Sequence, residues 1–354
     1  MRPAIAGFRL AFMTFVALPG MAAFAAEKHA AFNDPAAAGP DFLVQGEYHG
    51  TLANGAVIAA QVVALGNGKF DGVLYSGGLP GSGWDDVTRF HFKGETAGGE
   101  TRIAGIHGER LMFENADLQG TIRDEVFRGR ADMFRNLLAD ATFEMRKVHR
   151  RSPTLGAKPP SGAIVLFDGS SAGEWVEGQI VEGSLLDVGT ETKRRFSSLR
   201  FHLEFRTPFM PTAEGMARGN SGVYINKAWE IQVLDSFGWN DSNRKFVRLA
   251  DFGRCGGIHE MAGPRINMSF PPLAWQTYDV EFVAARFDGT GARVSPAVMT
   301  VRHNGVLIHD RVILPAAPPE ANASDPKYRE PGPLMLQKHG NPVRFRNIWA
   351  VEMR

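Results

Sequence analysis

The chain has 354 residues, of which 44% are hydrophobic and 22% charged, a globular balance with enough length for two domains. Its 39 Lys and Arg nearly cancel its 38 Asp and Glu, which argues against nucleic acid or an anionic lipid surface as a partner. The single cysteine, Cys255, excludes an intramolecular disulfide and a cysteine-based zinc site.

The N-terminus predicts export. Arg2 and Arg9 precede an apolar stretch, Leu10–Leu18, and Ala23-Phe24-Ala25 offers the small residues that a signal peptidase reads. Residues 1–25 are therefore interpreted as a signal peptide, and the mature protein is expected in the periplasm or outside the cell. The stretch is shorter than the about 20 residues of a membrane span, and no later span is expected. Residues 26–46 are interpreted as a flexible tether.

Residues 47–150 predict a small β-rich domain. Short apolar runs are divided by glycines and by turn pairs such as Asn54-Gly55 and Asn67-Gly68. A helix is expected there only at 131–143. Residues 151–162 contain three prolines and two glycines, which predicts a linker between domains. The clearest predicted strands are 57–63, 69–75, 89–92, 102–106 and 110–113.

Residues 163–354 predict an antiparallel β-sandwich. Phe201, Leu203 and Phe205 alternate with polar residues, as in a half-buried strand. Residues 276–287 alternate in the same way, and residues 297–314 form a predicted hairpin around an Asn-Gly turn. Long alternating strands with almost no helical period are typical of two packed sheets, so the fold class is all-β.

The first candidate site lies on the predicted strand 229–236. Glu230 and Gln232 share one strand face, where a carboxylate and an amide are costly to bury without partners but suit the floor of a polar cleft. Asp235 falls on the opposite face of an ideal strand and joins the cleft only if the strand ends or bulges first. The alternative is a solvent-facing strand with ordinary polar residues.

A second cluster lies at 333–347. His339 is placed in a turn between two strands, where an imidazole is available for acid/base work or metal binding, although a loop histidine is often only solvated. Arg344 and Arg346 share a strand face and could hold carbonyl or hydroxyl oxygens. No H-x-H or H-E-x-x-H pattern occurs, so a metal site would need distant segments, and its existence stays open.

The C-terminal half resembles the 3-keto-disaccharide hydrolase domain family, through an ordered series of motifs. The resemblance implies a concanavalin-like jelly roll, as in lectins and glucanases, in an exported protein that acts on carbohydrate. The leader followed by a small β-rich domain resembles the arrangement of planctomycete members. The motifs are 164–169, 174–175, 219–224, 229–236, 275–279, 303–306 and 332–340, followed by 344–349.

The resemblance also implies a chemistry. A ketone at C3 of a glycoside acidifies the proton at C2, so a base, an enolate-stabilising group and an acid could cleave the bond by elimination, with water added later. Direct hydrolysis by paired carboxylates is the rival route. The hypothesis makes Glu230, His339 and Asp235 catalytic, with a divalent cation as a possible cofactor. The candidate substrate-binding residues are Asn220, Tyr224, Gln232, Gln337, Arg344 and Arg346.

One departure and one rival qualify this hypothesis. Laminarinase-type glucanases of the same broad fold carry E-x-D-x-E on one strand, whereas this chain has Gln232 where the middle acid would stand, which argues against retaining glucanase chemistry. The rival is a non-catalytic, lectin-like carbohydrate-binding module, whose tryptophans would stack on sugar rings. A third interpretation is a structural domain whose site has lost its activity. Nothing in the sequence requires an oligomer.

Overall fold

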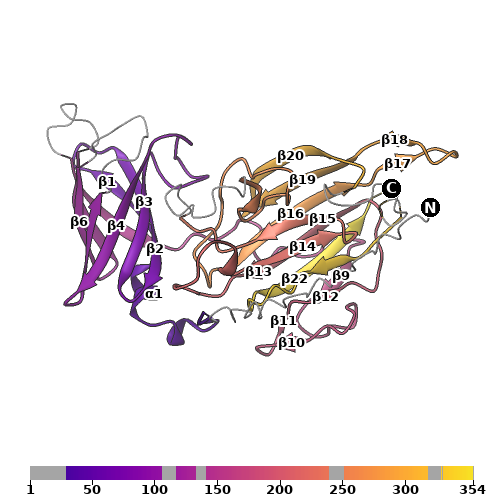
Figure 1. The fold of residues 1–354 in the computed structure, drawn as a ribbon, viewed down its shortest axis with the longest axis horizontal. Coiled ribbons are helices and arrows are strands. Elements are labelled where there is room, and N and C mark those ends of the chain that lie inside the picture. Colours follow the sequence, from indigo (N-terminus) through magenta and orange to yellow (C-terminus); the bar gives the residue numbers. More distant parts are fainter. Residues whose placement is uncertain are drawn as a thin grey trace, which may run out of the picture.

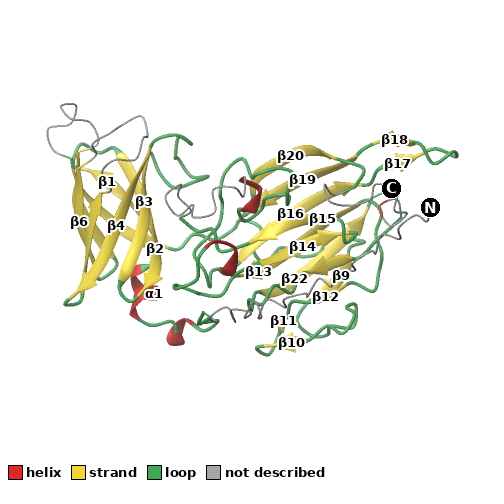
Figure 2. Cartoon of the chain, viewed as in Figure 1, coloured by secondary structure: helices red, strands yellow, loops and turns green. Residues whose placement is uncertain are grey.

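The computed structural model describes residues 29–105, 117–132, 141–238, 251–317, 328 and 330–353. Two β-rich units lie end to end, a barrel formed by the N-terminal part and a sandwich formed by the C-terminal part (Figure 1). Among the described residues, strands make up 50% and helices 5%, and the strands dominate both units (Figure 2). The expectation of an all-β fold with antiparallel sheets is therefore confirmed.

The barrel is closed, with every strand paired to its neighbour in the chain and the last strand paired to the first. Its interior is filled by inward side chains such as Tyr48, Phe92 and Phe127, as expected for a barrel of this size. Gly72 makes room for them, because a Cβ there would lie 2.2 Å from the Phe92 ring. The strands are β1 (Gly46–Leu52), β2 (Val57–Gly66), β3 (Lys69–Ser76), β4 (Arg89–Ala97), β5 (Glu100–Gly105), β6 (Asp117–Arg123), β7 (Val126–Asp132) and β8 (Thr142–Val148).

The helix expected at 131–143 is not supported at either end. Residues 131–132 close β7 and residues 142–143 open β8, while 133–140 lie outside the described residues. Phe143 and Met145 point into the barrel and Thr142 and Glu144 are exposed, which is the period of a strand. The strand expected at 110–113 lies outside the described residues.

Residues 29–45 form more structure than a flexible tether would. A 3₁₀ turn, η1 (Pro35–Ala37), is followed by the short helix α1 (Pro40–Val44). Before them, Phe32 exchanges two backbone hydrogen bonds of 2.9 Å with Phe209 of the sandwich unit. The predicted signal peptide lies among residues 1–28, outside the described residues. Within the described part of the chain, no helix is both long and apolar enough to cross a membrane.

The sandwich consists of a larger and a smaller antiparallel sheet, with a two-stranded ribbon of β17 (Arg286–Phe287) and β18 (Arg293–Ser295) beside them. The larger sheet has the order β10 (Ile180–Val181), β11 (Leu185–Leu186), β22 (Arg344–Glu352), β13 (Leu199–Arg206), β16 (Gln276–Val283), β19 (Ala297–His303) and β20 (Val306–Leu314), and β9 (Ile164–Phe167) also pairs with β22. The smaller sheet has the order β12 (Thr190–Glu191), β21 (Leu334–Leu336), β14 (Ser221–Ile225) and β15 (Trp229–Val233).

The core of the sandwich lies between these two sheets. Phe201, Leu203 and Phe205 of β13 are buried there together with Val223 and Ile231 of the smaller sheet. The predicted hairpin at 297–314 is confirmed as β19 and β20, paired antiparallel around the Asn-Gly turn.

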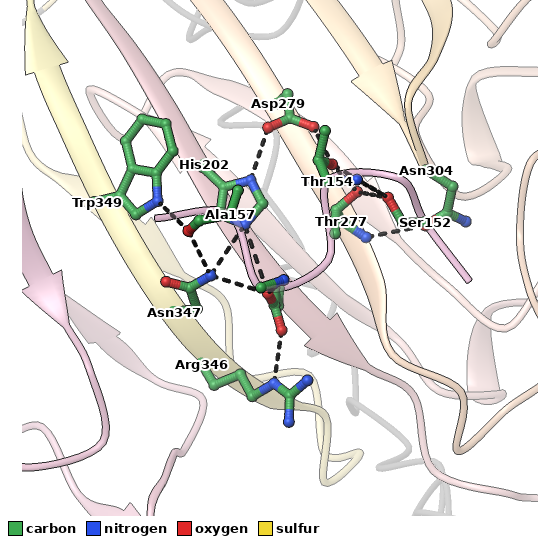
Figure 3. A network of polar contacts seen from close by, with 12 residues as sticks. Ser152, Thr154, Ala157, His202, Thr277, Asp279, Asn304, Arg346, Asn347 and Trp349 are labelled. Atoms are coloured by element: carbon green, nitrogen blue, oxygen red, sulfur yellow. Dashed lines mark hydrogen bonds and ion pairs between the residues drawn. The ribbon is translucent and has the colours of Figure 1, made fainter. Parts of the chain in front are cut away.

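The Pro- and Gly-rich linker is held against the face of the larger sheet that points away from this core (Figure 3). The Ser152 hydroxyl lies 2.6 Å from that of Thr277, and Thr154 donates to Asp279 at 2.7 Å. Further along, the Ala157 carbonyl accepts a hydrogen bond from the Trp349 indole at 3.2 Å. The linker is therefore an anchored strap rather than a free connection.

His202 lies beneath this strap with no exposed surface, its ring stacked on Trp349 at 5.3 Å between centroids (Figure 3). Its Nδ1 is 2.7 Å from Asp279 and its Nε2 is 3.8 Å from Glu204. Glu204 also accepts from Arg346 at 2.7 Å. Burial opposes a charge on His202, but the two carboxylates outweigh it and raise the imidazole pKa. Burial likewise disfavours the Glu204 carboxylate, but the nearby His202 ring and the hydrogen bonds from Asn347, the Gly156 N–H and Arg346 lower its pKa to about 2.

These shifts predict how stability changes with pH. A raised histidine pKa stabilises the fold below the unfolded value of about 6.5, and this contribution is lost as the pH rises through the folded value. We expect His202→Gln to destabilise the protein by about 1–3 kcal/mol at pH 6, and by less at pH 9. Urea unfolding of wild type and His202→Gln between pH 6 and 9 checks this. A difference in unfolding free energy between the two proteins that does not change with pH would contradict it.

Candidate active site

The site is built on the hairpin of β14 and β15. Val223, Ile231 and Val233 turn into the sandwich core, so the residues between them occupy the other face of the smaller sheet. Tyr224 lies directly opposite Glu230 in the strand register. The pairing register of the hairpin thus places a phenol beside a carboxylate.

Glu230 is nearly enclosed, with 6% of its surface exposed. Its Oε2 accepts a hydrogen bond of 2.6 Å from the Tyr224 hydroxyl, which itself accepts one of 3.2 Å from Gln337 Nε2. Nδ1 of His259 lies 3.9 Å from the same carboxylate oxygen. Together these contacts hold the carboxylate in one orientation.

The surroundings of Glu230 raise its affinity for a proton. Burial raises the pKa of the Glu230 carboxyl, and the opposing effects of Tyr224, His259 and His339 do not cancel it. Burial and the nearby Glu230 also raise the pKa of Tyr224, so the phenol stays protonated and acts as a donor. A carboxyl with a raised pKa takes up a proton more readily than a solvated one near neutral pH, which is the property of a general base.

Gly222 is the residue that makes room for this carboxylate. A Cβ at that position would lie 2.1 Å from Oε1 of Glu230, so any other side chain would displace it. The Gly-Val-Tyr sequence at 222–224 therefore supplies an open position and the phenol in one short strand.

Two predicted substrate-binding amides are used within the protein. Nε2 of Gln232 donates to Asn220 Oδ1 at 2.8 Å and to the carbonyls of Ser221 and Val233, both at 3.0 Å. Gln232 and Asn220 are each 1% exposed and fix the base of the hairpin. Gln337 differs, because its Oε1 is buried without a hydrogen-bond partner among the described residues. That oxygen is the unpaired acceptor of this cluster, and it is exposed to a sugar hydroxyl only if the Gln337 side chain turns.

The remaining predicted residues lie in different places. His339 is exposed on the loop after β21, close enough to Glu230 to affect its pKa electrostatically. Asp235 is buried in an ion pair with Arg218, whose Nε lies 2.6 Å from its Oδ2. The structure thus brings Tyr224 and Gln337 to Glu230 and places His339 near them, whereas the Asp235 carboxylate is directed elsewhere.

The two predicted arginines belong to β22 of the other sheet. Arg344 pairs with Glu182 at 2.6 Å and Asp187 at 2.7 Å. Arg346 pairs with Glu204 and lies over the Trp275 ring, 3.9 Å from its centroid. They do share a strand face, as predicted, but it points away from the sandwich core, and β22 is in the opposite sheet from Glu230.

His259 was not identified from the sequence. It belongs to a segment that runs along the free edge of β15, where its backbone N–H donates to the Glu230 carbonyl at 3.0 Å. Gly256 and Gly257 make two further backbone hydrogen bonds of 2.8 Å with Gln232. No local pattern marks this segment, since it is held by a strand far away in the sequence.

Among the residues with described side chains, no group of three or more His, Cys, Asp and Glu could hold a metal ion. Glu230 has a phenol, an amide and one imidazole around it, which is a proton-transfer set rather than an oxygen-rich cation site.

The fold and the site define a two-part β-protein whose sandwich carries an enclosed carboxylate beside a tyrosine. Residues 162–351 match the family described as 3-keto-alpha-glucoside-1,2-lyase-like domains. The chain belongs to this family, as the sequence motifs predicted.

A solved structure from Parabacteroides distasonis, described in its name as "a putative glycosyl hydrolase", is 30% identical. The alignment covers 55% of this chain and 85% of that one, with a TM-score of 0.47. No curated protein matches this sequence.

Proposed function

We propose that this protein is an exported carbohydrate-active enzyme that cleaves 3-keto-disaccharides and related 3-keto-glycosides at the Glu230 face of the smaller sheet. The observation that carries this proposal is the buried Glu230 carboxylate, with raised pKa and a 2.6 Å hydrogen bond from Tyr224. The family match supports the substrate class, and the predicted jelly-roll topology and periplasmic or extracellular location belong to the same proposal.

In the proposed reaction, Glu230 removes the proton from C2 of the 3-keto sugar. The C2–H electron pair forms the C2–C3 double bond of an enolate, with the negative charge on the C3 oxygen. The enolate then re-forms the ketone, C1–C2 becomes a double bond, and the bond from C1 to the glycosidic oxygen breaks with its electrons leaving on that oxygen. Addition of water across C1–C2 completes a net hydrolysis.

The neighbouring side chains fit the other roles of this reaction. The Tyr224 hydroxyl has a single hydrogen, which it donates to Glu230 in the free protein. As Glu230 takes the C2 proton, this hydrogen can turn to the enolate oxygen, where charge develops in the transition state. His339 on the adjacent loop, or His259 beside the carboxylate, supplies the proton to the leaving glycosidic oxygen. The unpaired Gln337 Oε1 accepts from a sugar hydroxyl once its side chain turns.

Elimination is favoured over direct hydrolysis because neither predicted partner of Glu230, at position 232 or at Asp235, offers a free carboxylate. Glycosidases that hydrolyse directly need two carboxyl groups about 5–9.5 Å apart across the bond. Position 232 is an amide, and the Asp235 carboxylate is held by Arg218. The carboxylate that does lie near Glu230 is Glu260, which helps to raise the Glu230 pKa and lies 3.9 Å from Nε2 of His259. A lectin-like module binds hydroxyl groups without moving a proton, so it does not require a carboxyl with a raised pKa, whereas a general base benefits from one.

The test is to compare a chemically 3-oxidised disaccharide with its unoxidised parent, in D₂O, and to analyse the products by NMR. We expect cleavage of the oxidised disaccharide only, with deuterium at C2 of the product. The same oxidised disaccharide incubated in D₂O without enzyme corrects for spontaneous exchange at C2. Cleavage of the parent at a similar rate would refute the proposal. Binding of either sugar without cleavage would instead support the lectin-like alternative.

A further inference from the structure

The barrel and the sandwich are interlocked by more than the linker. Phe209 follows β13 of the sandwich yet is fully buried in the core cluster of the barrel, with its ring 5.3 Å from that of Phe42. Gly238 follows β15 and lies so close to β2 that a Cβ there would be 2.4 Å from Val63. The interface between barrel and sandwich thus reaches the chain segment that follows the β14–β15 hairpin, on which the candidate active site is built.

Arg218 is the polar centre of this interface, and its side chain is 7% exposed. Its Nε donates to Asp235 at 2.6 Å, just after β15 ends. Its Nη1 donates to the Ala64 carbonyl on β2 at 3.0 Å, and its Nη2 to Gln45 Oε1 at 3.3 Å. One planar guanidinium therefore connects the hairpin to the barrel, a role that its fixed fork of donors suits better than a lysine.

A continuous set of contacts leads from this ion pair to Glu230. The Asp235 N–H donates to the Arg218 carbonyl at 3.1 Å, which closes the far end of the β14–β15 hairpin. The next residue, Ser236, accepts at Oγ from the Cys255 N–H at 3.1 Å. Cys255 begins the segment that pairs with β15 as far as His259 and the Glu230 carbonyl.

We propose that the barrel is a support for the active-site hairpin, and that Arg218 is the positioning residue that transmits this support through Asp235 to Glu230 and His259. Asp235 is fully buried, so without the guanidinium its carboxylate would be an uncompensated charge. The hairpin end would then separate from the barrel to hydrate it, and the 255–259 segment, which pairs with β15, would loosen with it. The effect on catalysis rests on the proposed function, whereas the structural coupling does not.

Cys255 provides a probe of this coupling that needs no substrate. It is the single cysteine, it is fully buried, and burial raises the pKa of its thiol to about 11, so a thiol reagent reports opening of its segment. We expect Arg218→Met to be labelled at least about tenfold faster than wild type under native conditions, since breaking a buried ion pair is strongly destabilising locally. Arg218→Lys should lie between the two.

The matched control is Arg206→Met. Arg206 is also an enclosed arginine, 14% exposed and paired with Glu182 at 2.7 Å, but its recorded contacts lie within the sandwich. Global stability of each variant is measured by urea unfolding, so that labelling through complete unfolding can be subtracted. Labelling of Arg218→Met no faster than Arg206→Met after this correction would overturn the proposal.

If Arg218→Met does not fold, Gln45→Met tests the same connection from the barrel side, because it removes the oxygen that accepts from both Arg218 Nη2 and the Ala64 N–H. Faster Cys255 labelling in this variant supports the coupling, and unchanged labelling refutes it.

The turnover measurement separates this proposal from the proposed function. If wild type cleaves the 3-keto-disaccharide, Arg218→Met should lower kcat more than it raises KM and shift the Glu230-dependent limb of the pH profile to lower pH. If wild type is inactive but the labelling result holds, the coupling stands and the assigned activity is wrong.

Discussion

Replacing Glu230 by Gln should lower kcat/KM for a 3-keto-disaccharide by about 10²–10⁴-fold, the usual contribution of a positioned general base. The substitution keeps the shape of the side chain and an oxygen that can accept the Tyr224 hydrogen bond, but it cannot take up the C2 proton. The measurement is steady-state turnover of the oxidised disaccharide by both proteins. Retention of wild-type activity would place the chemistry elsewhere in the molecule.

The same variant should not lose stability, which distinguishes a catalytic effect from misfolding. The pKa of Glu230 is raised above its ordinary value of 4.5, so the folded state binds the proton more tightly than the unfolded state. The contribution of this group to the unfolding free energy is therefore lost as the pH rises from 4.5 through the raised folded-state pKa. We expect Glu230→Gln to be at least as stable as wild type at pH 8 in urea unfolding.

Tyr224→Phe is the companion variant for this experiment. It removes the phenol that donates at 2.6 Å while leaving the carboxylate in place. Its expected loss of turnover is smaller, about 10-fold to 10³-fold, as for removal of a single donor to a developing oxyanion. A loss equal to that of Glu230→Gln would mean that the two groups act as one unit.

The second large effect is expected on stability. Phe209→Ala should destabilise the protein by about 3–5 kcal/mol, the usual cost of removing a fully buried phenyl ring. The ring is completely enclosed between Phe42 and Phe32, at centroid distances of 5.3 and 6.3 Å. Because it joins the two units, its loss weakens the barrel core and the interface together. Urea or thermal unfolding measures the change.

Leu43→Ala is the matched control for this variant. Leu43 lies on α1, beside Phe42, but its side chain is 68% exposed. Truncation of an exposed side chain is expected to change the unfolding free energy by no more than about 0.5 kcal/mol. A Phe209→Ala effect as small as that of Leu43→Ala would show that the enclosure of the ring contributes little to holding the two units together.

Several features of this protein follow from local sequence alone. The alternation of Phe201, Leu203 and Phe205 predicts a strand of the sandwich, and the Asn-Gly turn predicts the β19–β20 hairpin. The spacing of Glu230 and Gln232 predicts that they share a face. These inferences succeed because strand periodicity and turn conformation are set by neighbouring residues. The family motifs are also short local patterns, and the family match over residues 162–351 confirms the resemblance that they indicated.

The composition of the site was decided by pairings between distant segments. His259 reaches Glu230 because its segment joins the edge of β15, and Asp235 is drawn away because Arg218 pairs with it and with the barrel backbone at Ala64. Arg344 and Arg346 share motifs with the other candidates but lie on the opposite sheet. A strand's alternation determines which residues share a face, whereas sheet order and domain packing determine which faces meet. That second choice depends on the summed contacts of the whole chain, and no single segment encodes it.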